Sequence, residues 1–291
     1  MALMEADLLA AAHDRGPRRV KVIRPVAFSP RDLRTGLLAL TDYRDLLVAL
    51  SVHRLKVRYK QSVLGIAWAI IQPVALMLIY TLVFSIVTQV KSTGVPYAVF
   101  AYAALLPWSF FSTGLTNATN GLVSHAQLVT KVYFPREILP ISYVVAALVD
   151  LLIASLVMVG LMIYYRVPLT TQTLWIFPIV VVMTAFVTSC ALVFSAMQVR
   201  VRDIGMAMPL LLQLWMFASP VVYPLHQVPE RYRELYVLNP MVGIIENFRA
   251  ALLGTSMDHH SLWISTVVSL VLLPLSFLYF KRVEATVADV I

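Results

Sequence analysis

The feature that most constrains this chain is the run of residues 63–90, which contains no charged side chain. About 20 predominantly apolar residues in an α-helix cross a hydrocarbon core, so this run is long enough to span a membrane with some tilt. Pro73 lies inside the run and removes one backbone hydrogen-bond donor, which predicts a bend in the helix. The chain is therefore expected to be an integral membrane protein.

Residues 42–61, which precede this run, have the pattern of an amphipathic helix. Four apolar side chains recur at steps of four, three and four residues and so share one side of a helix: Val48, Val52, Leu55 and Tyr59. Four cations occupy the other sides: Arg54, Lys56, Arg58 and Lys60. This pattern predicts a helix in the membrane interface, with its cations among the lipid headgroups.

Five further apolar segments follow along the chain. They cover residues 97–115, 138–165, 174–199, 204–223 and 261–280. Hydrophobic residues make up 60% of the chain and charged residues 13%, whereas an ordinary soluble domain has about half and a quarter. The predicted fold is an all-α membrane protein, in which residues 62–282 form a domain of six transmembrane helices.

Residues 224–260, between the fifth and sixth segments, form a different kind of connection. Asn239-Pro240 is a helix-start signal, and an apolar face at helical spacing follows it as far as Gly254. A helix of this length is too short to cross a bilayer. We expect two short re-entrant or gate helices at one face of the membrane.

The distribution of positive charge predicts the orientation. Of the 23 Lys and Arg residues, 18 lie in four segments: residues 1–61, 116–137, 200–203 and 281–291. Because cytosolic segments carry such an excess, the tails 1–41 and 283–291 are predicted in the cytosol and residues 224–260 outside. For the basic N-terminal tail, contact with anionic lipid is preferred over nucleic-acid binding.

Three stretches of the chain carry a family resemblance. They are Arg58-Tyr59-Lys60-Gln61-Ser62 with Leu64-Gly65, Trp68 and Gln72-Pro73; residues 131–140; and Leu238-Asn239-Pro240-Met241 with Phe248-Arg249. Together they resemble the ABC-2 type permeases that export bacterial surface polysaccharides, over residues 40–282. The resemblance implies a homodimer in the bacterial inner membrane that moves a polyprenyl-diphosphate-linked glycan outward, with two copies of a separate ABC nucleotide-binding subunit.

The resemblance assigns ATP and Mg to that partner subunit and no cofactor to this chain. A P-loop needs a glycine-rich turn followed by lysine and serine or threonine, and none of the ten glycines opens one. Residues 117–134 resemble the helix that couples such permeases to their ATPase. The candidate coupling residues are Asn117, Asn120, His125, Gln127, Lys131, Tyr133 and Phe134. The cations of residues 42–61 would pair with the diphosphate of the substrate, or with headgroups only, and both roles stay open.

Aromatic side chains are candidates for lining a glycan channel, although lipid contact also explains many of them. They are Tyr80, Phe84, Tyr102, Trp108, Phe110, Phe111, Trp215 and Tyr223. Asp150 is costly in lipid, so it should face protein or water, as a structural carboxylate in preference to a substrate contact. No catalytic residue and no metal site is predicted, because His53 and His125 have no ligand or nucleophile at a useful spacing.

The expected function is that of a transporter subunit, with O-antigen as the preferred cargo. Export of capsular polysaccharide or teichoic acid is the nearest alternative. A membrane-embedded glycosyltransferase or polymerase would need carboxylates grouped for acid-base or metal chemistry, and the acidic residues of 224–260 show no such motif. A small-drug exporter of the same superfamily lacks the signature that begins at Arg58.

Overall fold

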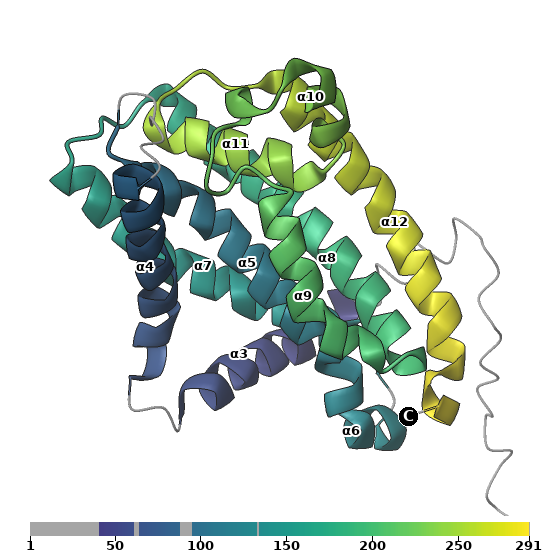
Figure 1. Cartoon of the computed structure of the whole chain (residues 1–291). Helices are drawn as coiled ribbons and strands as arrows, with labels where there is room; N and C mark the ends of the chain where they lie inside the picture. The colour runs from purple at the N-terminus through teal and green to yellow at the C-terminus, as the bar shows by residue number, and fades with distance from the viewer. Residues whose placement is uncertain (1–40, 61–63, 88–94, 133, 291) are drawn as a thin grey trace, which may run out of the picture.

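The computed structural model describes residues 41–60, 64–87, 95–132 and 134–290, and this part of the chain contains helices and no strand (Figure 1). The all-α class is therefore confirmed. The main helices are α3 (Arg44–Lys60), α4 (Trp68–Tyr80), α5 (Tyr97–Ser124), α6 (Ala126–Lys131), α7 (Ile138–Tyr164), α8 (Ile176–Arg200), α9 (Asp203–Phe217), α10 (Glu230–Val237), α11 (Pro240–Leu253) and α12 (His259–Val290). Residues 1–40, which include the basic tail, lie outside the described residues.

Helix α5 forms the centre of the molecule and contacts α4, α7, α8, α9 and α11. Its buried side includes Ala101, Ala103 and Ala104, and small side chains let neighbouring helices approach closely in a membrane protein. Larger side chains of the same helix, among them Phe100 and Leu105, fill the space between the helices that surround it. Most of α5 is thus buried in protein, whereas α7, α8 and α12 expose much of their apolar surface.

Four helical segments of the described chain are long and apolar enough to cross a membrane: Tyr97–Ser124, Ile138–Tyr164, Thr171–Arg200 and His259–Glu284. Two shorter apolar segments, Trp68–Phe84 and Asp203–Phe217, stand where the first and fifth spans are predicted. The first comprises α4 and a π-helical continuation, η2 (Thr81–Val87).

Helix α9 ends at Phe217, six residues before the predicted end of the fifth span. Proline disfavours the helical conformation of the residue before it and cannot donate to the helical ladder. Pro220 therefore stops the helix soon after Phe217.

Helix α5 extends beyond residue 115, the predicted end of the second span, and continues to Ser124. Asn117 and Asn120 donate through Nδ2 to the carbonyls of Thr113 (2.8 Å) and Thr116 (3.2 Å), one turn earlier in the same helix. Polar side chains of this kind are compatible with a helix when they bond to its own backbone. The polarity of residues 117–124 therefore marks a protein-facing part of α5 and does not mark a loop.

The two ends of the helix bundle differ in what covers them. Helix α3 and helix α6 lie at the end where α12 finishes, and α10 and α11 cover the opposite end (Figure 1). Helix α11 begins as predicted, because the Asn239 side chain accepts from the Met241 backbone N–H at 3.1 Å and Pro240 is its first residue. It ends at Gly254, whose φ of 68° is left-handed.

The last helix is longer than the predicted sixth span. It continues through Lys281 and Arg282 to Val290, so the segment predicted as a C-terminal tail is helical up to that residue. This extension brings α12 beside the start of α7.

Candidate functional site

Helix α3 lies where the interface helix is predicted, and it has two distinct faces. Ser51 and Arg54 are buried against the protein, and Leu47 and Leu50 pack on the cluster that α7, α8 and α12 share. Val48 and Val52, two members of the predicted stripe, are exposed. An apolar face that the protein leaves uncovered is what contact with the membrane interface requires.

The prediction that Arg54 lies among headgroups is wrong, because the protein encloses its side chain. Nε donates to Ser142 Oγ at 2.7 Å, and the guanidinium lies 3.4 Å from the centre of the Tyr143 ring. Burial lowers the pKa of Arg54, and the nearby Tyr143 partly offsets this shift. Arg54 thus fastens α3 to α7, while Lys56 and Lys60 stay exposed.

Arg58 and Asp150 form an ion pair between α3 and α7, through Nη1 and Oδ2. The Arg58 side chain is 35% exposed and that of Asp150 15%. Asp150 was expected to face protein or water, and the structure pairs it with Arg58, a partner that was not identified from the sequence. A carboxylate within an apolar span needs a nearby cation or polar surroundings. The presence of Asp150 in an apolar run was therefore the sequence feature that indicated such a partner.

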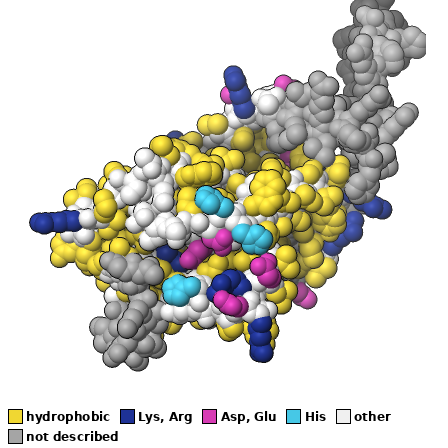
Figure 2. All heavy atoms as spheres, turned by 90° about the horizontal axis from the view of Figure 1, so that it is seen from above, with side chains coloured by type: hydrophobic (Ala, Val, Ile, Leu, Met, Phe, Trp, Pro, Cys, Tyr) yellow, Lys and Arg dark blue, Asp and Glu magenta, His cyan; other side chains and the backbone are white. Residues whose placement is uncertain are grey.

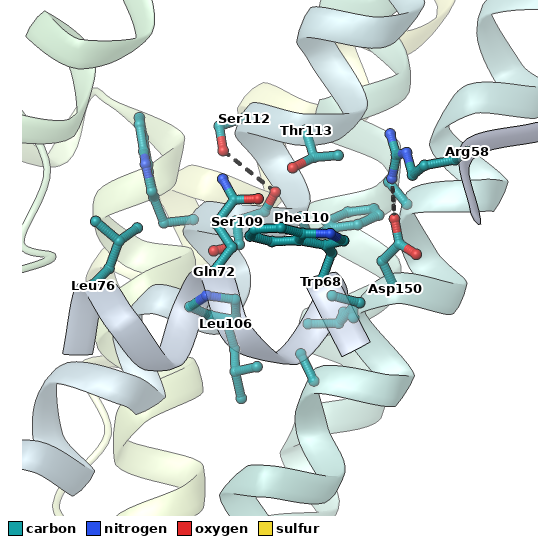
Figure 3. Close-up of a pocket in the computed structure, with 16 residues that line it drawn as sticks. Arg58, Trp68, Gln72, Leu76, Leu106, Ser109, Phe110, Ser112, Thr113 and Asp150 are labelled. Carbon is teal, nitrogen blue, oxygen red and sulfur yellow. Dashed lines mark hydrogen bonds and ion pairs between the residues drawn. The ribbon is translucent and has the colours of Figure 1, made fainter. Parts of the chain in front are cut away.

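A cavity of about 490 Å³ opens beside this ion pair, between α3, α4, α5 and α7 (Figure 3). Its polar lining comes from three helices besides α3. Helix α4 contributes Trp68 and Gln72, α5 contributes Ser109, Ser112 and Thr113, and α7 contributes Asp150. Figure 3 shows the Trp68 indole, the Gln72 amide and the α5 hydroxyls gathered around the same space, with Arg58 and Asp150 at its side.

Several of these polar groups have no hydrogen-bond partner among the described residues. Within the described residues, the structure gives no hydrogen bond to the Gln72 amide, the Trp68 indole N–H or the Thr113 hydroxyl. Other threonines of the spans, Thr119 and Thr184, donate to the carbonyl four residues earlier at 2.7 Å. The Thr113 hydroxyl is therefore available to the contents of the cavity.

The predicted channel aromatics are divided among different environments. Trp108 and Phe110 line the cavity, whereas Tyr102 and Phe111 are fully buried between helices of the same chain. Tyr80 and Phe84 are partly buried and meet edge to face. Trp215 Nε1 donates to Asn239 Oδ1 at 3.0 Å, and Tyr223 OH lies 2.5 Å from Tyr236 OH, so these two aromatics join α9 and its following turn to the α10–α11 region.

The candidate coupling residues extend from α5 into α6. Gln127 and Lys131 are exposed on α6. His125 is half-buried between the two helices, where Nδ1 lies 3.0 Å from the Gly121 carbonyl oxygen, and burial lowers its pKa. Phe134 is buried, while Tyr133 lies outside the described residues. The part of this segment that another protein could contact directly is therefore α6.

A charge cluster around the buried Glu137 consists of Arg136, Glu137, Lys281 and Glu284, and it fixes the chain just after α6. Lys281 Nζ lies 2.8 Å from Glu137 Oε2 and 2.9 Å from Glu284 Oε2. The Arg136 backbone N–H donates to Glu284 Oε1 at 3.0 Å, and its guanidinium donates to the Glu284 carbonyl at 2.7 Å. The cluster thus ties the connection between α6 and α7 to the end of α12.

The opposite end of the molecule gathers acidic and histidine side chains in the middle of a mostly apolar face (Figure 2). His260 Nε2 lies 3.3 Å from Glu234 Oε2. In the described part of the chain, no group of three or more His, Cys, Asp or Glu side chains is arranged to hold a metal ion. Beneath this face, Arg249 of α11 is buried, donates to the Pro220 and Val221 carbonyls and to Glu246, and stacks on Phe100.

Comparison of the sequence with known protein families identifies the family of this all-α membrane protein. Residues 45–253 match the family described as ABC-2 type transporter, and the chain belongs to that family. It is 35% identical to the O-antigen export system permease protein RfbA of Myxococcus xanthus, over 80% of this chain and 90% of the relative. It is 26% identical to the RfbA protein of Klebsiella pneumoniae, over 85% and 95%. It is 26% identical to the polysialic acid transport protein KpsM of Escherichia coli, over 76% and 88%.

Proposed function

We propose that this chain is the permease subunit of an ABC exporter that moves a polyprenyl-diphosphate-linked polysaccharide outward across the bacterial inner membrane. The observation that carries the proposal is the 35% identity to an O-antigen export permease across 90% of that relative. O-antigen is the preferred cargo on this basis. The similarity to the polysialic acid transport protein keeps capsular polysaccharide as the alternative.

The experiment is deletion of the gene in its source bacterium. Loss of the surface polysaccharide, with lipid-linked glycan accumulating inside the cell and wild-type protein restoring the surface polymer, would support the proposal. Loss of polymer attached to the lipopolysaccharide core would identify O-antigen, and loss of a polymer that is not attached to that core would identify the alternative. An unchanged surface polysaccharide would contradict both.

Within this function, two copies of the chain would form a homodimer that binds two ABC nucleotide-binding subunits, which carry ATP and Mg. Helix α6 supports this assignment, since it carries exposed residues and the charge cluster ties its connection with α7 to the end of α12. A movement of the ATPase against α6 would therefore reach two spans directly. Six spans would place both termini in the cytosol, with α4 and α9 as the two short ones.

The orientation can be tested by cysteine labelling, because Cys190 is buried and is the only cysteine. In a Cys190→Ala background, Gln127→Cys on α6 should be labelled only after the membrane is made permeable. Tyr232→Cys on α10 should be labelled in intact spheroplasts. The opposite result would reverse the orientation and the direction of transport.

A further inference from the structure

We propose that the cavity between α3, α4, α5 and α7 binds the junction between the phosphate and the first sugar of the substrate, and that Asp150 weakens this binding by competing for Arg58. The proposal rests on the proposed function and adds a binding site to it. It assigns Arg58 to a phosphate, and it assigns Trp68, Gln72 and Thr113 to the sugar.

The cavity needs a polar occupant. Its size lies within the range of about 300–1,000 Å³ that ligand sites occupy. The Gln72 amide and the Thr113 hydroxyl belong to apolar segments of a membrane protein and have no partner among the described residues. Hydrocarbon offers such groups nothing to bond with and leaving them unpaired is costly, so lipid tails are poor occupants.

The lining of the cavity indicates which kind of ligand it binds. A sugar ring has hydroxyls around its edge and apolar C–H groups on its faces, so it needs both hydrogen-bonding groups and a flat apolar surface. Trp68 is 49% exposed and presents its indole beside the cavity, close to Gln72 and the α5 hydroxyls (Figure 3). An indole combines a large apolar face with one N–H donor. This lining suits a sugar better than it suits an apolar molecule.

Arg58 lies at the side of this polar lining. A guanidinium pairs with a phosphate through a planar fork of donors. The Arg58 side chain is partly exposed, whereas Arg54 is enclosed and already bonded to Ser142. Of these two arginines, Arg58 lines the cavity and can receive an anion while a sugar attached to that anion lies in the cavity.

Asp150 sets the strength of this interaction. Its carboxylate neutralises Arg58 through Nη1 and would stand beside any phosphate that the guanidinium receives. Like charges at such a separation repel each other, and the repulsion is stronger away from bulk water. A transport site must release its cargo as well as bind it, and a built-in competing carboxylate keeps the affinity moderate.

The test uses the full chain with its ATPase partner in nanodiscs of neutral lipid. The probes are farnesyl diphosphate and farnesyl diphosphate carrying one sugar, tried in turn as glucose, galactose and N-acetylglucosamine. Arg58→Gln should weaken binding of all probes by about tenfold, because a charge-assisted contact is lost. Thr113→Val, which preserves side-chain shape, and Gln72→Ala should weaken only the probes that carry a sugar. Asp150→Asn, whose amide oxygen can still accept from Arg58, should tighten binding of every probe.

Lys56→Gln is the matched control, because it removes the same charge from an exposed position on the same helix. If it weakens binding as much as Arg58→Gln does, the attraction is general and the site is wrong. Weaker binding to Asp150→Asn would overturn the competitor role, and equal binding of every probe to wild type would overturn the sugar contact. If Arg58→Gln does not fold, Asp150→Asn still tests the competitor role and Thr113→Val still tests the sugar contact.

Addition of phosphatidylglycerol to the nanodiscs separates substrate from lipid headgroups. If the site binds lipid headgroups, this lipid should displace the probes from the wild-type protein but should not change probe binding to Arg58→Gln. That result would contradict the proposal. If the wild-type protein does not bind the probes while the deletion strain still loses its surface polysaccharide, the proposed binding site is wrong and the proposed function remains supported. An intact surface polysaccharide in the deletion strain removes both.

Discussion

Replacing Lys281 by methionine should strongly destabilise the protein, because it leaves Glu137 without its cation. The Glu137 side chain is 0% exposed, and Lys281 Nζ lies 2.8 Å from its carboxylate. Removing one partner of a buried ion pair costs about 3–5 kcal/mol, since the other charge stays buried and uncompensated. Glu284, which Lys281 also contacts at 2.9 Å, adds repulsion between two carboxylates. For a chain of this size, we expect the unfolding midpoint to fall by about 6 °C or more.

The dependence on pH provides a second measurement of the same effect. Burial raises the pKa of Glu137, the charge of Glu284 raises it further, and Lys281 opposes both. Without Lys281 the pKa of Glu137 rises again, so the folded protein binds this proton more tightly than the unfolded chain does. Protonation of Glu137 therefore stabilises the folded variant at low pH, and this contribution is lost as the pH rises through the pKa of Glu137 in the folded state. The deficit of Lys281→Met should therefore shrink between pH 7.5 and pH 5.5.

The assay is thermal unfolding of the detergent-solubilised protein, followed by tryptophan fluorescence. Adding Glu137→Gln to Lys281→Met should recover a large part of the loss, because a neutral amide replaces the uncompensated charge. Lys56→Met, at an exposed position of α3, should change stability by less than about 0.5 kcal/mol. A Lys281→Met protein as stable as wild type, or a deficit that grows on acidification, would refute the reasoning.

Three further outcomes are expected. Gly243→Ala should destabilise the protein by about 1–3 kcal/mol, because its new methyl group would clash with the Ser261 carbonyl oxygen of α12. Gly160→Ala, with nothing within 4 Å, should be neutral or stabilising in the same unfolding assay. Arg54→Lys should lower stability by about 1–2 kcal/mol, since lysine cannot both stack on Tyr143 and bond to Ser142 as the guanidinium does; Lys56→Arg should have no effect, and equal losses from the two would contradict the packing role. Gln127→Glu with Lys131→Glu on α6 should reduce co-purification of the ATPase subunit while the permease stays folded; Lys60→Glu is its control, and an intact complex would remove α6 from the coupling interface.

Local patterns were sufficient for much of the fold. The apolar runs predicted α7 and α8 to within about two residues at each end, because an α-helix that crosses lipid satisfies its own backbone and needs a long uncharged run. The Asn239-Pro240 start and the Gly254 end of α11 were likewise readable, since a capping side chain and a left-handed glycine act within one turn of the helix. The motifs that resemble the ABC-2 permeases also indicated the family from the sequence alone.

What the sequence could not determine was which side chains meet. Four cations of α3 look equivalent along the chain, yet the packing of α3 on α7 encloses Arg54, pairs Arg58 with Asp150 and leaves Lys56 and Lys60 exposed. Glu137 and Lys281 are far apart in the sequence, and so are Gln72 of α4 and Thr113 of α5, which line the same cavity. Periodicity tells how one helix divides into faces, whereas the partner of each face depends on how helices distant in the sequence pack together. The sequence alone therefore determined the class, the helices and the family, and only the tertiary structure decided the ion pairs and the cavity.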